Sequence, residues 1–180
     1  MATASFSQST VVPIENMKTT VQVAGQTYYY KDVNGAFDKF IGNWRYQDSQ
    51  LNPSKIVEIS FFKRGPLLSG MGYYYDELYA LIKYTHNGVV VYNTYPTNIP
   101  PLMTRDYNIF GGYFKEPTNT NLLNIEYYSE PGLGGKTGRL FLEYDDNGGS
   151  PILNWKVRSF RDPSNHFKIP NDMVLVKELM

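Results

Sequence analysis

Apolar and polar residues alternate along most of the chain with a period of two. In residues 56–63, Val57, Ile59 and Phe61 share one face, and mainly polar residues occupy the other. Successive side chains of a β-strand point to opposite faces of its sheet, so this alternation predicts half-buried strands. We expect roughly ten strands, over residues 27–31, 43–47, 56–63, 70–75, 78–84, 89–95, 107–114, 122–128, 139–144, 152–160 and 173–178.

Turn-forming residues separate these segments. Asn87-Gly88 lies between two alternating runs, and this pair favours the positive φ angles of a type I′ hairpin turn. We expect Gly65-Pro66 to end one strand and Asp76-Glu77 to form a turn. Residues 36–41 carry apolar side chains at helical spacing and predict a single helical turn that ends at a glycine.

The pattern predicts an all-β fold. No amphipathic helical segment exceeds two turns, and the connections are too short for the crossovers that parallel strands need. We therefore expect an antiparallel sandwich or barrel of about 8–10 strands. Residues 27–180 form one domain in this interpretation, and residues 1–26 form an N-terminal arm that is flexible or docks as an edge strand. Residues 19–23 are the strand candidate within that arm.

Composition narrows the function classes. The chain has 17 basic and 17 acidic residues, so its zero net charge argues against a nucleic-acid partner. Cysteine is absent and only His86 and His166 are present, which disfavours thiolate metal sites and histidine-rich centres. No apolar run is long enough for a transmembrane helix, so we expect no integral membrane segment. We expect no metal, no cofactor and no catalytic residues.

Tyrosine is unusually frequent, with 16 copies beside 10 phenylalanines. One explanation is structural, because tyrosine rings pack well on sheets while their hydroxyls stay in water. The other is a barrel interior lined by rings that holds an apolar or sugar-like ligand. Under the second explanation, the candidate ligand-binding residues are Tyr84, Tyr127, Tyr144 and Trp155.

Acidic residues on the predicted strands leave a further alternative open. Glu58, Glu126 and Glu143 are single acids, and two of them would form a glycosidase-like pair if the fold brought them together across a barrel. Their structural explanation is salt bridging to Lys63, Lys83, Lys156 or Arg158.

The segment Phe40-Ile41-Gly42-Asn43-Trp44 resembles the start of the first long strand in calycin barrels, the lipocalins and fatty-acid-binding proteins. The resemblance implies a lipocalin-like (calycin-like) β-barrel with a short N-terminal helical turn. It also implies that Trp44 closes one barrel end, with Gly42 beside it and a cation from a late strand above the ring. Arg158 or Lys177 would be that cation, and Arg158 is our principal candidate.

A second resemblance covers residues 10–180. Residues 29–33, 37–44, 74–78 and 83–88 look like a family of uncharacterised secreted proteins from Bacteroidota, a domain of unknown function. The resemblance implies export and brings no catalytic residues. The small residues at positions 2–5 are similar to those around a signal-peptide cleavage site, so we expect a removed signal peptide and a periplasmic, cell-surface or extracellular location. A cytosolic protein with a loose N-terminal arm stays open.

These observations favour a non-enzymatic binding protein for a small hydrophobic or amphiphilic ligand. A closed barrel whose interior is filled solid by large rings would rule that hypothesis out. The alternative is a secreted or surface module with a filled barrel that contacts a protein partner through exposed tyrosines. A carboxylate-dependent hydrolase is the weaker alternative.

Overall fold

The computed structural model describes residues 9–95, 109–128, 138–159 and 168–178, and the described chain is almost entirely β-structure. Two short 3₁₀ turns accompany the strands, η1 (Ile14–Asn16) and η3 (Asn147–Gly149). The strands are β1 (Thr10–Pro13), β2 (Tyr28–Lys31), β3 (Gly42–Gln47), β4 (Lys55–Leu68), β5 (Tyr74–His86), β6 (Val89–Asn93), β7 (Ile109–Gly111), β8 (Tyr113–Phe114), β9 (Leu122–Tyr128), β10 (Gly138–Asp145), β11 (Ile152–Ser159) and β12 (Asp172–Lys177).

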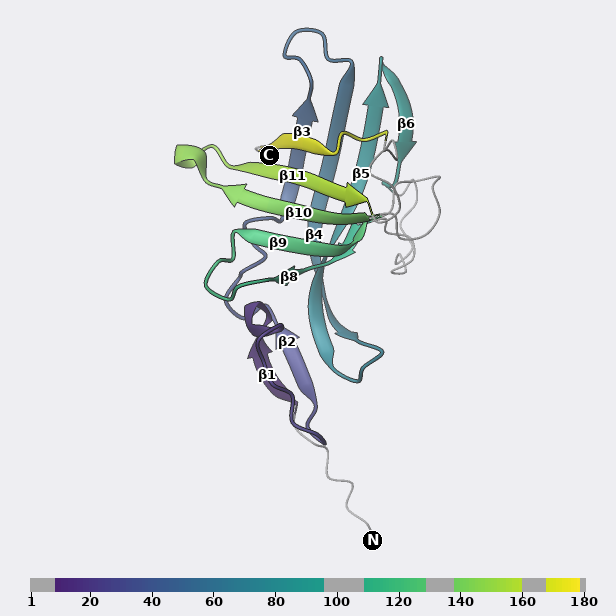
Figure 1. The fold of residues 1–180 in the computed structure, drawn as a ribbon. Helices are drawn as coiled ribbons and strands as arrows, with labels where there is room; N and C mark the ends of the chain where they lie inside the picture. Colours follow the sequence, from purple (N-terminus) through teal and green to yellow (C-terminus); the bar gives the residue numbers. More distant parts are fainter. Residues whose placement is uncertain (1–8, 96–108, 129–137, 160–167, 179–180) are drawn as a thin grey trace.

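All of these strands belong to one sheet. Its order is β1-β2-β5-β4-β3-β12-β11-β10-β9-β7, with β6 paired to β5 and β8 paired to β9. Strands β9, β10 and β11 cross the long strands β3, β4 and β5, so the sheet folds over on itself into two layers (Figure 1). At one edge, β7 pairs with both β9 and β5 and links the layers through short ladders.

The all-β class is confirmed, but the expectation of a uniform antiparallel barrel of 8–10 strands is corrected to one large mixed sheet. Strand β2 pairs in parallel with β1 on one side and with β5 on the other. Parallel pairing needs a long connection between the strands. The β3–β4 pair supplies that connection between β2 and β5, without the crossover helix that our argument assumed.

Strand β1 of the N-terminal arm occupies the edge of the sheet, which is one of the two arrangements that we expected for the arm. The position of the strand differs from expectation, because residues 19–23 form no strand. Residues 36–40 form successive turns rather than a helix, with amide–carbonyl bonds such as Phe40 N to Phe37 O at 2.9 Å. Both rings in this segment are fully buried, which explains their helix-like spacing.

Strands β4 and β5 run through the two sites where we expected them to stop. Both strands continue through these sites, and the register between them shifts there, between the pairs Arg64–Glu77 and Leu67–Tyr75. The Asp76 carboxylate accepts hydrogen bonds from the Tyr29 hydroxyl at 2.8 Å and the Asp32 amide at 2.9 Å. A side chain at position 65 would collide with this carboxylate, so the glycine permits the close approach.

Asp32 fixes the turn that leads into β3. Its carboxylate accepts hydrogen bonds from the Ala36 amide at 2.6 Å and the Phe37 amide at 3.4 Å. Lys63 of β4 pairs with the same carboxylate at 2.8 Å. Buried acids need such partners to offset lost hydration, so Asp32 and Asp76 together fasten the N-terminal segment to the sheet.

The predicted hairpin at Asn87-Gly88 is confirmed. Strands β5 and β6 are antiparallel neighbours, and Asn87 and Gly88 have φ angles of 49° and 75°.

Large rings and aliphatic side chains fill the core between the layers. The largest fully buried side chains are Trp44, Trp155, Tyr30, Tyr79, Tyr128, Phe37, Phe40, Phe61, Phe114, Ile14, Ile59 and Leu78.

Candidate functional site

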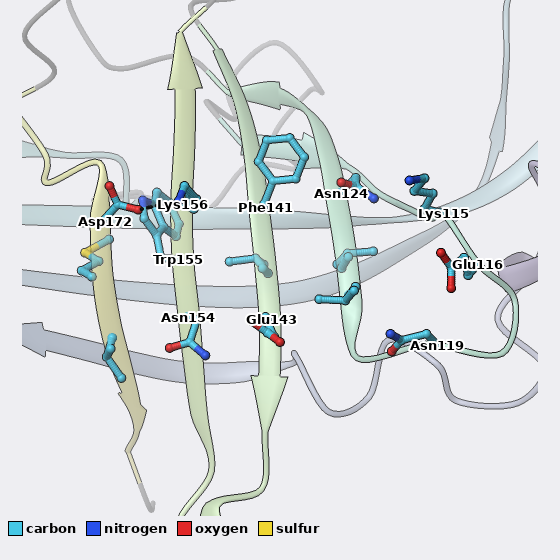
Figure 2. Close-up of a pocket in the computed structure, with 15 residues that line it drawn as sticks. Lys115, Glu116, Asn119, Asn124, Phe141, Glu143, Asn154, Trp155, Lys156 and Asp172 are labelled. Carbon is cyan, nitrogen blue, oxygen red and sulfur yellow. Dashed lines mark ion pairs between the residues drawn. The ribbon is translucent and has the colours of Figure 1, made fainter. Parts of the chain in front are cut away.

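The second layer carries a groove on its outer face. This groove, which we call the β9–β12 groove, has a volume of about 700 Å³. It crosses strands β9, β10, β11 and β12 and reaches the segment that joins β8 to β9 (Figure 2). That volume falls within the usual range of small-molecule sites, roughly 300–1,000 Å³.

Two rows of side chains cross the strands in register and line the groove. The first row is Asn124, Phe141, Lys156 and Asp172, one from each strand, as Figure 2 shows. The second row is Leu122, Glu143, Asn154 and Val174. Each of these positions alternates with a buried neighbour on its own strand, such as Leu140, Leu153 or Met173. The rows therefore follow directly from period-two patterning.

The chemistry of the groove is mixed. Phe141 is half-buried, and the Arg158 guanidinium lies 5.5 Å from the centre of its ring. Leu122 and Val174 are 42% and 49% exposed. Leu122 and Val174 lie at the two ends of their row, with Glu143 and Asn154 between them, so the exposed apolar side chains alternate with polar ones across this face.

Polar groups lie beside the apolar side chains in both rows. Lys156 and Asp172 form an exposed ion pair at 3.6 Å, which is worth little to stability in water. Asn124 and Asn154 are half-buried and offer amide donors and acceptors. The arrangement suits a ligand with one apolar part and one polar part.

The predicted ligand-binding residues lie mainly away from this groove. Tyr84 is buried at 2% exposure, with its ring 6.3 Å from that of His86. Tyr144 is partly buried and packs edge-on against Phe40 at 6.2 Å. The side chain of Tyr127 lies outside the described part of the structure.

Trp155 belongs to both regions. Its side chain is buried at 1% exposure and packs edge-on against Tyr128 at 5.8 Å. It also contributes to the lining of the groove. Among the described residues its indole Nε1 has no hydrogen-bond partner, which leaves one buried donor unsatisfied beside the groove.

Gly42 and Trp44 lie together as expected, but the cation above the indole is Lys177. Its ammonium is 5.2 Å from the centre of the Trp44 ring, and the indole Nε1 donates to the Phe40 carbonyl at 2.8 Å. The assignment of Arg158 to this position is corrected. Arg158 points outward on β11, next to the buried Val157, and contacts Phe141 instead.

Gly42 has a φ of 117°, and a side chain there would meet Lys177 Cε at 3.4 Å. The distance is an ordinary contact, and it is the positive φ that favours glycine at this position.

The three acids considered as a hydrolytic pair line three different pockets. Glu143 lies in the β9–β12 groove, whereas Glu58 lines a pocket on β3 and β4 and Glu126 lines one beside β7. Glu58 pairs with Lys83 at 2.8 Å, which confirms the salt-bridge interpretation at that position. Within the described ranges, no three potential metal-ligating side chains gather.

Sequence reasoning missed Phe141 as a site residue, although the alternating pattern placed it among the outward-facing residues of β10 and β11.

Sequence reasoning also missed Glu77, which is 2% exposed. Burial raises the pKa of this carboxyl above its ordinary value, while the hydrogen bond from Tyr79 and the charge of Arg64 oppose the rise.

Comparison with known proteins identifies a family. The model of DUF6705, a family of unknown function, matches residues 1–178, so the chain belongs to that family. The expectation of a family of unknown function is confirmed. No curated protein and no solved structure matches the chain. Over the described residues, none of the helices has the length and apolarity to cross a membrane.

Proposed function

We propose that this member of DUF6705 is a non-enzymatic binding protein that holds a small amphiphilic ligand in the β9–β12 groove. The observation that carries the proposal is the half-buried Phe141 ring in a groove whose lining combines apolar and polar side chains. Burying apolar ligand surface there supplies affinity of about 25 cal/mol per Å², and the polar side chains orient the polar end.

The groove is a better location for a ligand than the space between the layers. Trp44, Tyr128 and Phe114 are fully buried in one continuous core with their neighbours. Interiors packed in this way leave few voids larger than a water molecule. The proposal therefore moves the ligand from the interior, where we first expected it, to the outer face.

Titration with sodium dodecanoate and with dodecyl maltoside, both below their micelle concentrations, tests the proposal. We expect ¹⁵N amide shifts to change along β9–β12. We expect the Phe141→Ala variant to bind about tenfold more weakly, which corresponds to losing roughly 1.4 kcal/mol of ring contact. Tyr74→Ala is the matched control, because Tyr74 is also a partly exposed aromatic residue but lies on β5.

Three outcomes would contradict the proposal: no binding of either amphiphile, equal affinity in wild type and Phe141→Ala, or shift changes confined to the buried core. Native mass spectrometry of protein purified from its own host adds an independent check. A retained adduct of lipid mass that Phe141→Ala loses supports the groove.

A protein-interaction module is the second candidate, and the arrangement of tyrosines favours it. The half-buried rings of Tyr73 and Tyr75 are 6.0 Å apart. Tyr29 and Tyr74 add a neighbouring pair at 6.5 Å. Tyrosine clusters are enriched at protein interfaces. Chemical cross-linking in the native host, with Tyr74→Ala as comparison, tests this candidate, and unchanged cross-links in the variant would exclude Tyr74 as a contact.

We further propose that this mixed sheet, which is not closed into a barrel, is an open relative of the calycin fold and that the protein is exported in Bacteroidota. The β5–β7 pairing and the position of Trp44 beneath Lys177 support the fold proposal. Amide-to-amide NOEs between β5 and β7 test it. The genomic reading frame upstream of Met1 tests export, and a frame without a signal peptide would remove that part.

A further inference from the structure

The pocket beside β7, which Glu126 lines, lies where the segment after η1 meets strands β5, β7 and β9. Its volume is about 380 Å³. Its lining includes two acids, Glu77 and Glu126, and the rings of Tyr73, Tyr75 and Tyr113, with Lys18 at its side. It shares none of its lining residues with the β9–β12 groove.

The two acids of this pocket differ in their surroundings. Glu77 is buried and accepts a hydrogen bond from the Tyr79 hydroxyl. Glu126 is half-exposed, at 49% for its side chain. A buried carboxylate and a second acid in one pocket create a negative potential, which attracts a cation.

Two glycines line the pocket beside Glu77. Gly111 has a φ of 96°, and a Cβ built there would lie 4.0 Å from Glu77 Oε2, an ordinary contact distance. Gly112, with a φ of 141°, follows it. Both backbone conformations favour glycine, so another residue at either position would be strained.

The chain already places one ammonium group on this site. Lys18 Nζ lies 4.2 Å from the centre of the Tyr113 ring and 3.6 Å from Glu126 Oε1. An ammonium over an aromatic face beside a carboxylate is the arrangement by which proteins recognise organic cations. Lys18 is 44% exposed on its side chain, so it can leave without disrupting the core.

Charge balance indicates how a ligand would enter. Arg64 is the cross-strand neighbour of Glu77, and Lys18 pairs with Glu126. These two positive charges match the two acids while Lys18 is in place. An incoming cation would therefore replace Lys18 rather than join it.

We propose that this pocket binds an organic ammonium ion, primary or methylated, with Lys18 as the internal group that it displaces. The rings supply cation–π attraction and the acids supply charge. The proposal stands independently of the β9–β12 groove.

The test uses n-butylammonium as the probe and n-butanol as its neutral counterpart, with binding followed by calorimetry and amide shifts. We expect n-butylammonium to bind the wild-type protein and n-butanol not to bind. Lys18→Met keeps the chain length and removes the competing charge, so it should bind n-butylammonium about tenfold more tightly. Glu126→Gln should bind about tenfold more weakly, and Glu143→Gln in the other groove is the matched control.

Glu77→Gln is a second loss variant, and Glu126→Gln keeps the test valid if burial at position 77 prevents folding. Equal binding of n-butanol, no binding to wild type, or unchanged affinity in Lys18→Met would overturn the proposal. Phe141→Ala should leave n-butylammonium binding unchanged. If n-butylammonium binds but neither amphiphile does, only the function proposed for the β9–β12 groove is excluded. If an amphiphile binds but n-butylammonium does not, only the ammonium site is excluded.

Discussion

Two faces of strand β10 use similar side chains for different purposes. Leu140 and Leu142 point inward and are buried with 0% and 1% exposure. Phe141, between them, points outward into the β9–β12 groove. Adjacent residues of a strand point to opposite faces of the sheet. A bulky apolar residue therefore contributes to stability at one position and is available to a ligand at the next.

The same contrast holds between the two aromatic–cation pairs. Trp44 is fully buried, donates to the Phe40 carbonyl and carries Lys177 on its ring. Phe141 carries Arg158 but keeps a half-buried ring. The pair at Trp44 is therefore built into the core, and the pair at Phe141 remains accessible.

The largest effect is expected at Trp44. Trp44→Ala removes a fully buried indole and leaves a cavity, so we expect a loss of about 3–5 kcal/mol in the free energy of unfolding. Urea unfolding followed by circular dichroism measures it. Trp44→Phe, which keeps a ring but removes the donor to Phe40, should cost clearly less. A Trp44→Ala variant as stable as wild type would show that the core does not depend on this ring.

Neighbouring substitutions on β10 compare the two faces directly. Leu140→Ala should cost about 2–5 kcal/mol because Leu140 lies in the core. Phe141→Ala should cost less than about 1 kcal/mol, since its ring is only half-buried. Differential scanning calorimetry of both variants measures the gap, and similar losses at the two positions would refute the division between faces.

A smaller effect is expected from the pH dependence at Glu77. Burial raises its pKa above the ordinary 4.5, so the folded state holds this proton more tightly than the unfolded chain does. The contribution of Glu77 to stability is therefore complete below the unfolded pKa and is lost as pH rises through the raised folded pKa.

Glu77→Gln cannot ionise, so its stability relative to wild type should be more favourable at about pH 7 than at about pH 4.5. Urea unfolding of both proteins at both pH values measures the difference. Glu143→Gln, on the exposed face of β10, is the control for the loss of one carboxylate. An equal stability difference at the two pH values would mean that Glu77 does not carry a raised pKa.

The smallest effect is expected at Lys177. Lys177→Met keeps most of the chain over the Trp44 ring and removes the charge, which costs about 0.5–1 kcal/mol at a partly exposed site. Thermal unfolding at low and high salt measures it. A loss larger than that of Leu140→Ala would place the cation, rather than the indole, at the centre of this cluster.

Much of the second layer could be predicted from the sequence. In β10 and β11 the inward set, such as Leu142 and Trp155, and the outward set, such as Phe141 and Lys156, lie on the predicted faces. These strands pair with neighbours close in sequence, so local patterning describes them well. The groove itself was missed because we assigned the ligand to the inward rings.

The first layer was harder to predict because distant partners override local preferences. Aspartate and glutamate usually occur in turns or on the surface, yet Asp76 and Glu77 are both buried within β5. Tyr29 and Asp32, more than forty positions away in the chain, satisfy Asp76. Hydrogen bonds of that sequence separation leave no periodic signal, so neither the length of β5 nor the parallel pairing of β2 could be anticipated.

The parallel position of β2 also bears on when each strand finds its partner. A ribosome releases β1 and β2 long before β5, since Tyr29 pairs with Tyr74, whereas β10 and β11 both lie within residues 138–159. A pair of short strands has only marginal stability in water by itself. Strands that are far apart in the sequence also pair slowly. The N-terminal strands are thus among the first to be synthesised, yet they can complete the sheet only after β5 has emerged.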